Sequence, residues 1–334
     1  METLRAGIIG VGRIGVLHAR TLKNNPAVSE LIVSDADVAR AREVAAQVGG
    51  VGGSVDELFA ARPDAIVVAA ATAAHAELVR RAAAAKIPVF CEKPLAADIP
   101  DTVAVIDAVR AAGTSLTMGF QRRSDAGYRA ARDAVASGRL GTVHAVYAAT
   151  FDPAPPPAAY IATSGGIFRD MLIHDFDIVR FVTGREVTRV YAAGANKGEP
   201  FFAAAGDVAT ASALLTFDDG TLGVVVGSRY NGRGYDVRLE VHGSRDTIAV
   251  GLDERVPLVS AEPGAGWPAA PPYPNFFERF AAAYAAEIDN FIAHVLGRID
   301  NPSPPRDALE ALYLAEAADR SRREGRPVNV AEVR

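Results

Sequence analysis

Three ionisable residues stand at helical spacing in one segment of the chain: Asp170, His174 and Asp177. At about 100° per residue they fall within an arc of about 60°, so a helix would carry all three side chains on one face. A carboxylate one turn before an imidazole can orient the ring and leave its second nitrogen free to move a proton. The spacing therefore predicts a general base, His174, oriented by Asp170.

The opposite side of this segment is apolar and consists of Met171, Leu172, Ile178, Val179 and Val182. The two sides together predict one helix over residues 167–182 that packs through its apolar side. A half-buried structural helix with a hydrogen-bonded histidine would show the same pattern. A catalytic role for this segment is favoured over a structural one by a second motif near the N-terminus, which is typical of dinucleotide binding.

That motif is a glycine-rich turn, Gly10-Val-Gly12-Arg13-Ile14-Gly15, which follows a short apolar run and opens a helical pattern. In such a turn the first glycine permits a tight bend and the second lets a pyrophosphate approach the backbone. The third lets the helix pack closely against its strand. The amides at the start of the helix, those of Arg13 and Ile14 among them, then face the phosphates.

Asp35 follows Gly15 by 20 residues, at the end of the second predicted strand. A carboxylate there can bind both ribose hydroxyls and would repel a 2′-phosphate. Arg40 and Arg42 could offset this repulsion, but we expect them to be solvated on the surface of the next helix. The sequence therefore predicts NAD rather than NADP. A general base beside such a cofactor indicates a site where a proton and a hydride leave the same substrate.

Two further strand ends carry polar residues. Thr72 and His75 follow one predicted strand, and Glu92-Lys93-Pro94 follows the next. Ligands of open α/β sheets bind outside the carboxyl ends of the strands, so we predict these residues beside the cofactor. Thr72 and His75 equally fit a helix cap and its first turn. A lysine before proline is held out of the α region or in a cis bond, so Lys93 is predicted to aim its ammonium into the site rather than into solvent.

The first third of the chain must position these residues. Apolar runs predict strands at residues 4–9, 30–34, 65–70, 89–91 and 115–118. Helical patterns lie between them, near residues 13–24, 37–47, 75–85 and 100–111. Such alternation predicts a parallel sheet with helices on both faces, which is an α/β Rossmann domain over residues 1–121.

The remaining residues, 122–334, predict an α+β domain. Runs rich in β-formers lie at residues 143–151, 187–193, 208–217, 222–229, 237–242 and 246–250, with a hairpin signal at Asp218-Asp219-Gly220. Helical patterns lie at residues 126–136, 276–296 and 307–322, and proline-rich loops at 152–157 and 263–274. The expected fold is an open, largely antiparallel sheet flanked by helices.

The composition narrows the class of protein. The chain has 334 residues, 49% of them hydrophobic and 22% charged, as in ordinary globular proteins. A net charge of -5 without a basic run argues against nucleic-acid or acidic-membrane partners. The single cysteine, Cys91, fits a reducing compartment. The N-terminal residues lack a signal-peptide pattern, and no apolar run reaches the ~18 residues of a membrane span, so we expect a cytoplasmic protein.

Four motifs follow one another along the chain: the glycine-rich turn, Glu92-Lys93-Pro94, Gly119-Phe-Gln-Arg-Arg123 and Asp170-x3-His174. Together they resemble the glucose–fructose oxidoreductase/inositol dehydrogenase superfamily over essentially the whole chain. Residues 152–157, 164–177 and 234–236 are most similar to bacterial inositol 2-dehydrogenases. The resemblance implies a Rossmann domain, an open mixed sheet that mediates oligomerisation, and a polyol site built from lysine, aspartate and histidine.

By position, the resemblance assigns catalysis to Lys93, Asp170 and His174. The substrate contacts that it implies are Arg123, Asp152 and Tyr235, and Gln121 joins the predicted cofactor contacts. It also implies a homo-oligomer, expected to be a tetramer, and a site without a metal ion.

The expected reaction is the NAD-dependent oxidation of a secondary hydroxyl of an inositol-like cyclic polyol to the ketone. His174 would take the hydroxyl proton, since an imidazole with a reference pKa of about 6.5 is largely neutral at pH 7. Lys93 would stabilise the developing alkoxide. Asp177 would bind a neighbouring hydroxyl or solvate the helix.

Alternatives from other classes stay open at this stage. A dehydrogenase of another sugar, or an NAD-dependent glycosidase on the same fold, would use the same residues. A sensor that only binds NAD would not need the catalytic residues, which are intact here. A metal hydrolase could use Asp170, His174 and Asp177 as ligands, but a lysine in the same site disfavours a metal ion.

The sequence departs from the inositol-enzyme pattern at three places. Phe151 stands where we expect a basic residue, Ala73-Ala74 replace polar residues, and Gly227 stands where asparagine is common. The differences at Phe151 and Gly227 are expected to affect which polyol fits.

Overall fold

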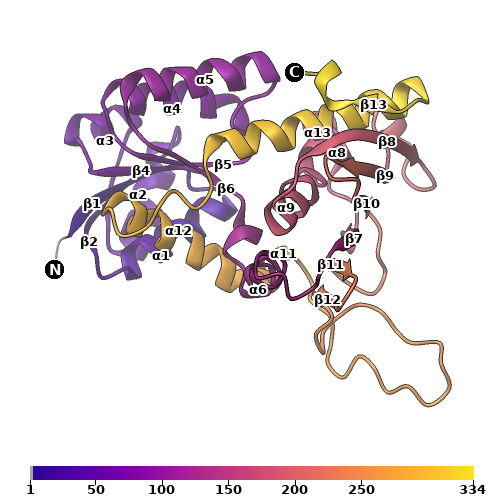
Figure 1. Ribbon diagram of the computed structural model, residues 1–334. Helices are drawn as coiled ribbons and strands as arrows, with labels where there is room; N and C mark the ends of the chain where they lie inside the picture. Colours follow the sequence, from indigo (N-terminus) through magenta and orange to yellow (C-terminus); the bar gives the residue numbers. More distant parts are fainter. Residues whose placement is uncertain (1–2) are drawn as a thin grey trace. The chain divides into compact units, whose positions relative to one another are not determined.

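The computed structural model describes residues 3–334 (Figure 1). The chain forms two compact units. One contains residues 3–124 together with Ala282–Leu309, and the other contains Asp125–Ala281 and Glu310–Arg334. Residues 282–309, expected in the second domain, lie in the first unit, and the packing of their helix explains why.

The first unit is built on a six-stranded sheet with the order β3-β2-β1-β4-β5-β6. Its strands, all parallel, are β1 (Leu4–Ile9), β2 (Val28–Ser34), β3 (Val51–Gly53), β4 (Ala65–Val68), β5 (Val89–Glu92) and β6 (Leu116–Gly119). Its helices are α1 (Arg13–Asn24), α2 (Val38–Val48), α3 (Val55–Ala61), α4 (Thr72–Ala84), α5 (Ile99–Ala112), the 3-10 helix η1 (Gln121–Ser124) and α12 (Ala281–Val295). This strand order is that of a dinucleotide-binding Rossmann fold, so the predicted architecture is confirmed.

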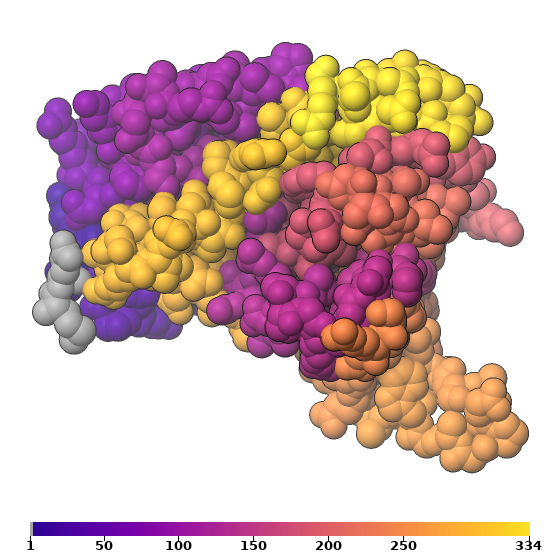
Figure 2. All heavy atoms as spheres, in the orientation of Figure 1, coloured from indigo at the N-terminus to yellow at the C-terminus, as the bar shows by residue number. Residues whose placement is uncertain are grey.

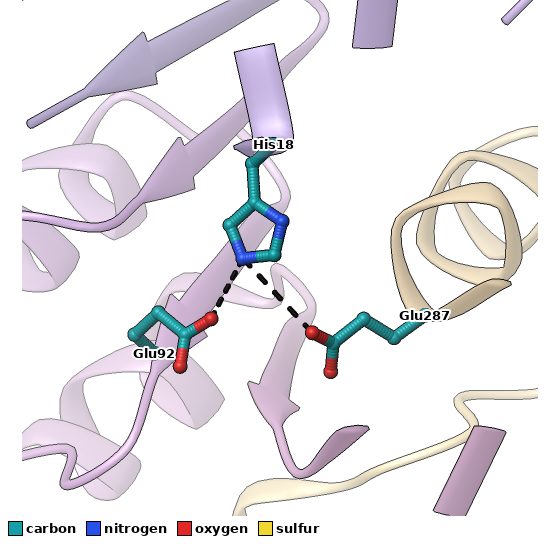
Figure 3. Close-up of side chains that lie close together, drawn as sticks. All are labelled: His18, Glu92 and Glu287. Carbon is teal, nitrogen blue, oxygen red and sulfur yellow. Dashed lines mark hydrogen bonds and ion pairs between the residues drawn. The ribbon is translucent and has the colours of Figure 1, made fainter. Parts of the chain in front are cut away.

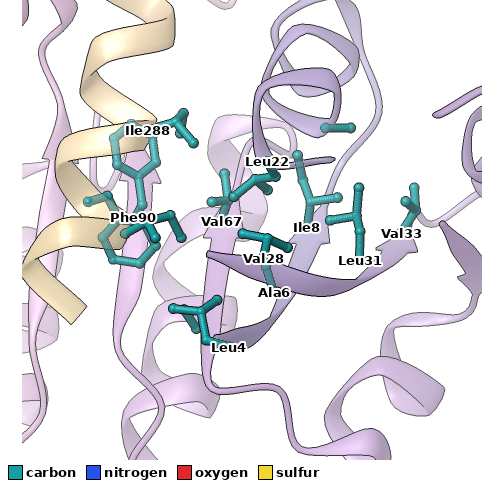
Figure 4. Close-up of a cluster of buried hydrophobic side chains, with 14 of the residues drawn as sticks. Leu4, Ala6, Ile8, Leu22, Val28, Leu31, Val33, Val67, Phe90 and Ile288 are labelled. Atoms are coloured by element: carbon teal, nitrogen blue, oxygen red, sulfur yellow. The ribbon is translucent and has the colours of Figure 1, made fainter. Parts of the chain in front are cut away.

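The core of this unit explains the position of α12. Figure 4 shows apolar side chains of the sheet, Phe90 among them, packed with Ile288 of α12. Phe291 and Ile292 of the same helix belong to the same buried cluster. The sequence predicts a helix over residues 276–296 with an apolar side. Periodicity shows that this side is buried, but not whether it packs into the core of the first or of the second domain. The structure also divides the predicted helix at Phe280, where α11 (Phe276–Arg279) ends.

The second unit is built on a seven-stranded sheet with the order β12-β11-β7-β10-β9-β8-β13. Its strands are β7 (Val143–Phe151), β8 (Val187–Ala195), β9 (Thr210–Phe217), β10 (Leu222–Ser228), β11 (Asp236–Gly243), β12 (Thr247–Val250) and β13 (Val328–Asn329). Within residues 3–334, neighbouring strands are antiparallel except for the parallel pair β7 and β10. The predicted, largely antiparallel sheet is therefore confirmed, and the predicted hairpin at Asp218-Asp219-Gly220 joins β9 to β10.

The helices of this unit are α6 (Ala126–Ala136), α7 (Ala158–Ile161), α8 (Ile167–Asp170), α9 (Ile173–Thr183), α10 (Phe201–Ala204), α11, most of α13 (Pro305–Glu324) and the 3-10 helix η2 (Val330–Glu332). A long loop between β12 and α11 (orange in Figure 2) extends from the unit and exposes Val259 and Trp267. Across the described residues, every helix is too short or too polar to span a bilayer.

Candidate active site

The glycine-rich turn of the first unit has the close packing that the sequence predicts. Gly10 has a φ of +96°, and a Cβ atom there would lie 2.4 Å from the backbone nitrogen of Ala70. A Cβ atom at Gly15 would lie 1.9 Å from the carbonyl oxygen of Gly10, so only glycine lets α1 start this close to β1. At Gly12, by contrast, a Cβ atom would meet nothing within 4 Å among the described residues. The open side of the turn is therefore at Gly12, where a pyrophosphate must approach the backbone.

Asp35 lies beside this turn and is held in place by backbone amides. The Val11 amide donates to Asp35 Oδ2 at 2.7 Å, and the Asp37 amide donates to Oδ1 at 3.0 Å. Arg40 is exposed, as expected, and also donates through Nε to the carbonyl oxygen of Val11 at 3.2 Å. A fixed carboxylate at the tip of β2 suits the ribose hydroxyls of NAD, so the residues present fit the predicted cofactor.

His75 connects the two strand ends that carry the other predicted residues. Its buried ring lies with Nδ1 2.7 Å from the Pro94 carbonyl oxygen and Nε2 3.0 Å from that of Ala70. The ring thus fixes the segment after β4 against the segment after β5, where a cis peptide joins Lys93 to Pro94. Thr72 is exposed at the first position of α4. Histidine at this position holds the backbone from which Lys93 extends.

The remaining predicted residues of the first unit lie after β5 and β6. Lys93 follows β5 directly and is half-buried. Gln121 and Arg123 are buried in η1, and Arg123 Nη1 forms an ion pair with Asp307 Oδ2 at 2.8 Å. The Glu92 carboxylate forms a hydrogen bond with His18 of α1.

In the second unit, Asp170 belongs to a polar cluster around the buried side chain of Arg229. Arg229 is 3% exposed and donates through Nη1 to Asp152 Oδ2 at 3.0 Å and through Nη2 to Asp170 Oδ2 at 2.6 Å. The Tyr160 hydroxyl donates to the other oxygen, Asp170 Oδ1, at 2.7 Å. Burial raises the pKa of Tyr160, and the charge of Asp170 raises it further, so this phenol remains a donor.

The same cluster stabilises the charge on Arg229. Burial acts to lower the pKa of the guanidinium, but Asp170 and Asp152 outweigh this effect and the net direction is upward. The metal-hydrolase alternative requires Asp170 to bind a metal ion. The ion pair between Asp170 and Arg229 disfavours this, because the carboxylate already binds a cation. The hydrogen bonds from Arg229 and Tyr160 fix the orientation of the Asp170 carboxylate.

Sequence reasoning missed Arg229 and Tyr160. Arg229 meets Asp152 because β10 runs parallel to β7, with Ser228 opposite Phe151, so both residues follow their strands at one edge of the sheet. The sequence showed an aspartate, Asp152, directly after one predicted β-run and an arginine, Arg229, at the end of another. The parallel pairing that brings them together was not.

The helix predicted over residues 167–182 is wrong in one respect, because the structure divides it into α8 and α9. The Leu172 amide bonds back to the carbonyl oxygen of Ile167, five residues earlier, which forms a wide turn in place of regular helix. The predicted apolar side is nevertheless buried throughout. Gly227 of β10 lies close to this turn, since a Cβ atom there would be 2.5 Å from Leu172 Cδ2. Glycine at this departure from the inositol-enzyme pattern thus makes room for the segment that carries Asp170 and His174.

His174 lies in the first turn of α9 and is half-buried. Asp177, expected on an open polar face, is only 1% exposed and therefore does not solvate the helix. Its neighbour Asp175 is buried too, with its two carboxylate oxygens 3.0 and 2.8 Å from the Thr150 hydroxyl. The Tyr235 ring packs edge-on against Phe276 and Phe280.

Comparison with known proteins identifies the family to which the two units belong. Residues 4–120 match the model of an oxidoreductase family with an NAD-binding Rossmann fold, and residues 128–249 match the GFO/IDH/MocA C-terminal domain. The chain is 39% identical to the myo-inositol dehydrogenase Hyg17 of Streptomyces leeuwenhoekii, over 96% of this chain and 98% of that protein. It is 38% identical to the inositol 2-dehydrogenase of Rhizobium meliloti (strain 1021), over 98% of this chain and 100% of that protein.

The chain is also similar to a solved structure that contains a cofactor and a polyol. The scyllo-inositol dehydrogenase of Lactobacillus casei, with bound cofactor NAD(H) and scyllo-inositol, has 28% sequence identity and a TM-score of 0.87, over 99% of this chain and 100% of that one. Sequence and fold agree along the full length of both units. The chain therefore belongs to the GFO/IDH/MocA family of oxidoreductases, and its first unit is that family's NAD-binding Rossmann domain.

Proposed function

We propose that the protein is an NAD-dependent dehydrogenase that oxidises a secondary hydroxyl of an inositol-like cyclic polyol to the ketone. The observation that carries this proposal is the full-length match to inositol dehydrogenases, one of them with NAD(H) and scyllo-inositol bound. The fixed Asp35 beside an open Gly12 supports the cofactor, and the Asp152–Arg229–Asp170 cluster supports a polyhydroxylated substrate.

In this proposal, His174 accepts the proton of the reacting hydroxyl and Lys93 donates a hydrogen bond to the same oxygen. NAD, when bound, supplies the hydride acceptor. Asp170 precedes His174 by one irregular turn, and its carboxylate accepts hydrogen bonds from Arg229 and Tyr160. A fixed negative charge near the imidazole favours the imidazolium that forms when the proton moves. Asp152, Arg123 and Tyr235 remain proposed substrate contacts.

The test is NADH formation by the purified protein with a panel of inositols and aldoses. The proposal expects the highest kcat/KM with an inositol. Absence of NADH with every polyol would overturn it. Release of phenol from an aryl glycoside without net NADH would identify the glycosidase alternative instead.

Cofactor preference gives a first prediction. We expect kcat/KM with NAD to exceed that with NADP by at least about tenfold, because Asp35 would bind the ribose hydroxyls and repel a 2′-phosphate. The substitution Asp35→Ser should narrow this gap by lowering the value for NAD and raising that for NADP. Steady-state kinetics with both cofactors measure it.

Asp37→Ser is the matched control, since Asp37 also carries a carboxylate after β2 but caps α2 through the Arg40 amide at 3.1 Å. It should leave the ratio of the two cofactors near that of the parent enzyme. Equal kcat/KM values for NAD and NADP in the parent enzyme would refute the role of Asp35.

Assembly gives a second prediction. We infer that the protein is a homo-oligomer, with a tetramer as the expected state. Support comes from the seven-stranded sheet, where Tyr191, Leu214 and Leu222 are 43%, 56% and 60% exposed. Tyr191 and Leu214 face each other across β8 and β9, so the exposed apolar side chains lie on one face. Such a face is typically covered by another subunit.

Light scattering at micromolar concentration should therefore give a mass of several times 35.0 kDa, the mass of one chain. Leu214→Glu should lower the measured mass, because it places a charge on the apolar face. Val51→Glu, at a similarly exposed valine of the first unit, is the control. A stable particle of one chain mass would contradict the inference.

We also propose that the enzyme works in the cytoplasm. The reaction draws on NAD, and the one cysteine, Cys91, is free and buried, as is common in reducing compartments.

A further inference from the structure

Three ionisable side chains from separate elements of the first unit meet in its interior (Figure 3). His18 lies on α1, Glu92 ends β5 and Glu287 lies on α12. His18 Nε2 lies 2.7 Å from Glu92 Oε1 and 4.0 Å from Glu287 Oε1. The side chains of His18 and Glu287 are 0% and 5% exposed, so this group is part of the core. The proposed reaction uses neither of these two side chains.

The charges of this group do not balance without protons. Two carboxylates surround one imidazole, and both oxygens of Glu287 lack a hydrogen-bond partner among the described residues. Burial raises the pKa of Glu287 well above 4.5, and the charge of Glu92 raises it further. The other groups nearby are the ring of Tyr284 and the buried thiol of Cys91, which precedes Glu92 in the chain. Glu287 is therefore the member of the group whose neutral form is favoured.

The distances favour a hydrogen bond over a metal ion. At 2.7 Å, His18 Nε2 and Glu92 Oε1 are at the length of a charge-assisted hydrogen bond. Two ligand atoms on a tetrahedral zinc ion, with bonds of about 2.0–2.1 Å, lie about 3.3 Å apart. The imidazole N–H thus lies between the two atoms, where a cation would need more room.

We propose that His18, Glu92 and Glu287 are positioning residues for the dehydrogenase reaction: His18 holds Glu92, the residue before Lys93, and Glu287 completes the buried group. His18 also belongs to the helix that begins at the glycine-rich turn, so the contact ties the pyrophosphate-binding helix to the strand end that carries Lys93. A lysine that must donate to one substrate oxygen needs such support, because a displacement of about 1 Å is costly for catalysis. This inference gives Glu92 a role other than direct cofactor binding, and its kinetic part rests on the proposed function.

The kinetic test compares His18→Leu with His18→Gln. Leucine fills a similar volume but cannot donate to Glu92, whereas glutamine keeps an N–H donor. We expect His18→Leu to lower kcat at least about tenfold while the KM for NAD changes less than about threefold, and His18→Gln to recover most of the loss. A kcat within about twofold of the parent for His18→Leu overturns the proposal. So does a glutamine variant no better than the leucine variant, since the N–H donor would then not matter.

A second test needs no substrate and therefore separates this inference from the proposed function. Above pH 4.5 the unfolded chain releases the Glu287 proton while the folded protein keeps it. Rising pH therefore increases the equilibrium constant of unfolding, by up to about tenfold per pH unit, until Glu287 titrates in the folded protein too. Glutamine mimics the neutral acid and cannot titrate. The thermal midpoint of Glu287→Gln should therefore rise relative to that of the parent as the pH increases from 5 to 8.

Glu310→Gln is the matched control, because Glu310 is also buried on a helix but forms an ion pair with Arg334. That variant should be less stable than the parent across the same pH range. If Glu287→Gln behaves in the same way, Glu287 is ionised and the proposal fails. Metal analysis that finds an equimolar divalent cation, whose chelation lowers the midpoint in the parent but not in His18→Leu, would assign the group to a metal site instead.

Discussion

His174→Ala is expected to lower kcat by about 100-fold or more while the affinity for NAD stays nearly unchanged, because it removes the group that accepts the hydroxyl proton. His174 lies in the second unit, on α9, whereas the glycine-rich turn and Asp35 lie in the first. The loss should therefore appear in kcat and not in cofactor binding. Steady-state kinetics with inositol and NADH binding followed by fluorescence separate the two effects.

The pH dependence provides an additional readout. In the parent enzyme, activity should rise with pH through the titration of the base, and this rise should be absent from the residual activity of His174→Ala. His144→Ala, at an exposed histidine of β7 in the same unit, is the control and should keep parental kinetics. If His174→Ala turned over polyol at nearly the parental rate around neutral pH, α9 would have only a structural role.

The elements that sequence reasoning located well are those whose signal is local. The strand Leu4–Ile9 and the helix Arg13–Asn24 have the predicted bounds, because an apolar run, a glycine-rich turn and a helical pattern lie within a few residues of one another. The helix Ala126–Ala136 and the strand Val143–Phe151 were located equally well. The strand Val51–Gly53 was missed, since one valine and two glycines form no apolar run.

The parts of the site that were missed depend on contacts between distant segments. The ion pairs of Arg229 follow from the parallel pairing of β7 with β10, which lie about 80 residues apart and which no turn joins directly. The wide turn between α8 and α9 depends on packing against Gly227. Periodicity gives the side of a helix that is buried, but not the element that covers it.

His18 is a residue that the sequence could have indicated. It is buried on α1 with Gly15, Ala19 and Leu22, at the spacing of one apolar helix side. A histidine on that side needs a polar partner within the core. Its partners, Glu92 and Glu287, come from segments far along the chain, so spacing alone could not identify them.

Lys93→Ala is expected to lower kcat/KM roughly 100-fold, because the substitution removes the donor that stabilises the developing alkoxide. This loss corresponds to about 3 kcal/mol of transition-state stabilisation. Lys93→Arg should recover only part of the loss, since a guanidinium keeps the charge but has a different shape and reach. Lys23→Ala, at an exposed lysine in the last turn of α1, is the control and should stay near the parental value.

The double variant Lys93→Ala, His174→Ala decides whether the two residues act on one oxygen. Groups that serve the same reacting atom are coupled, so the double variant should lose less activity than the product of the two single losses. Independent action would give losses that multiply, and the two residues would then belong to separate steps. Because Lys93 follows a strand of the Rossmann domain and His174 lies on a helix of the second unit, coupling between them would also show that catalysis requires both units at one substrate oxygen.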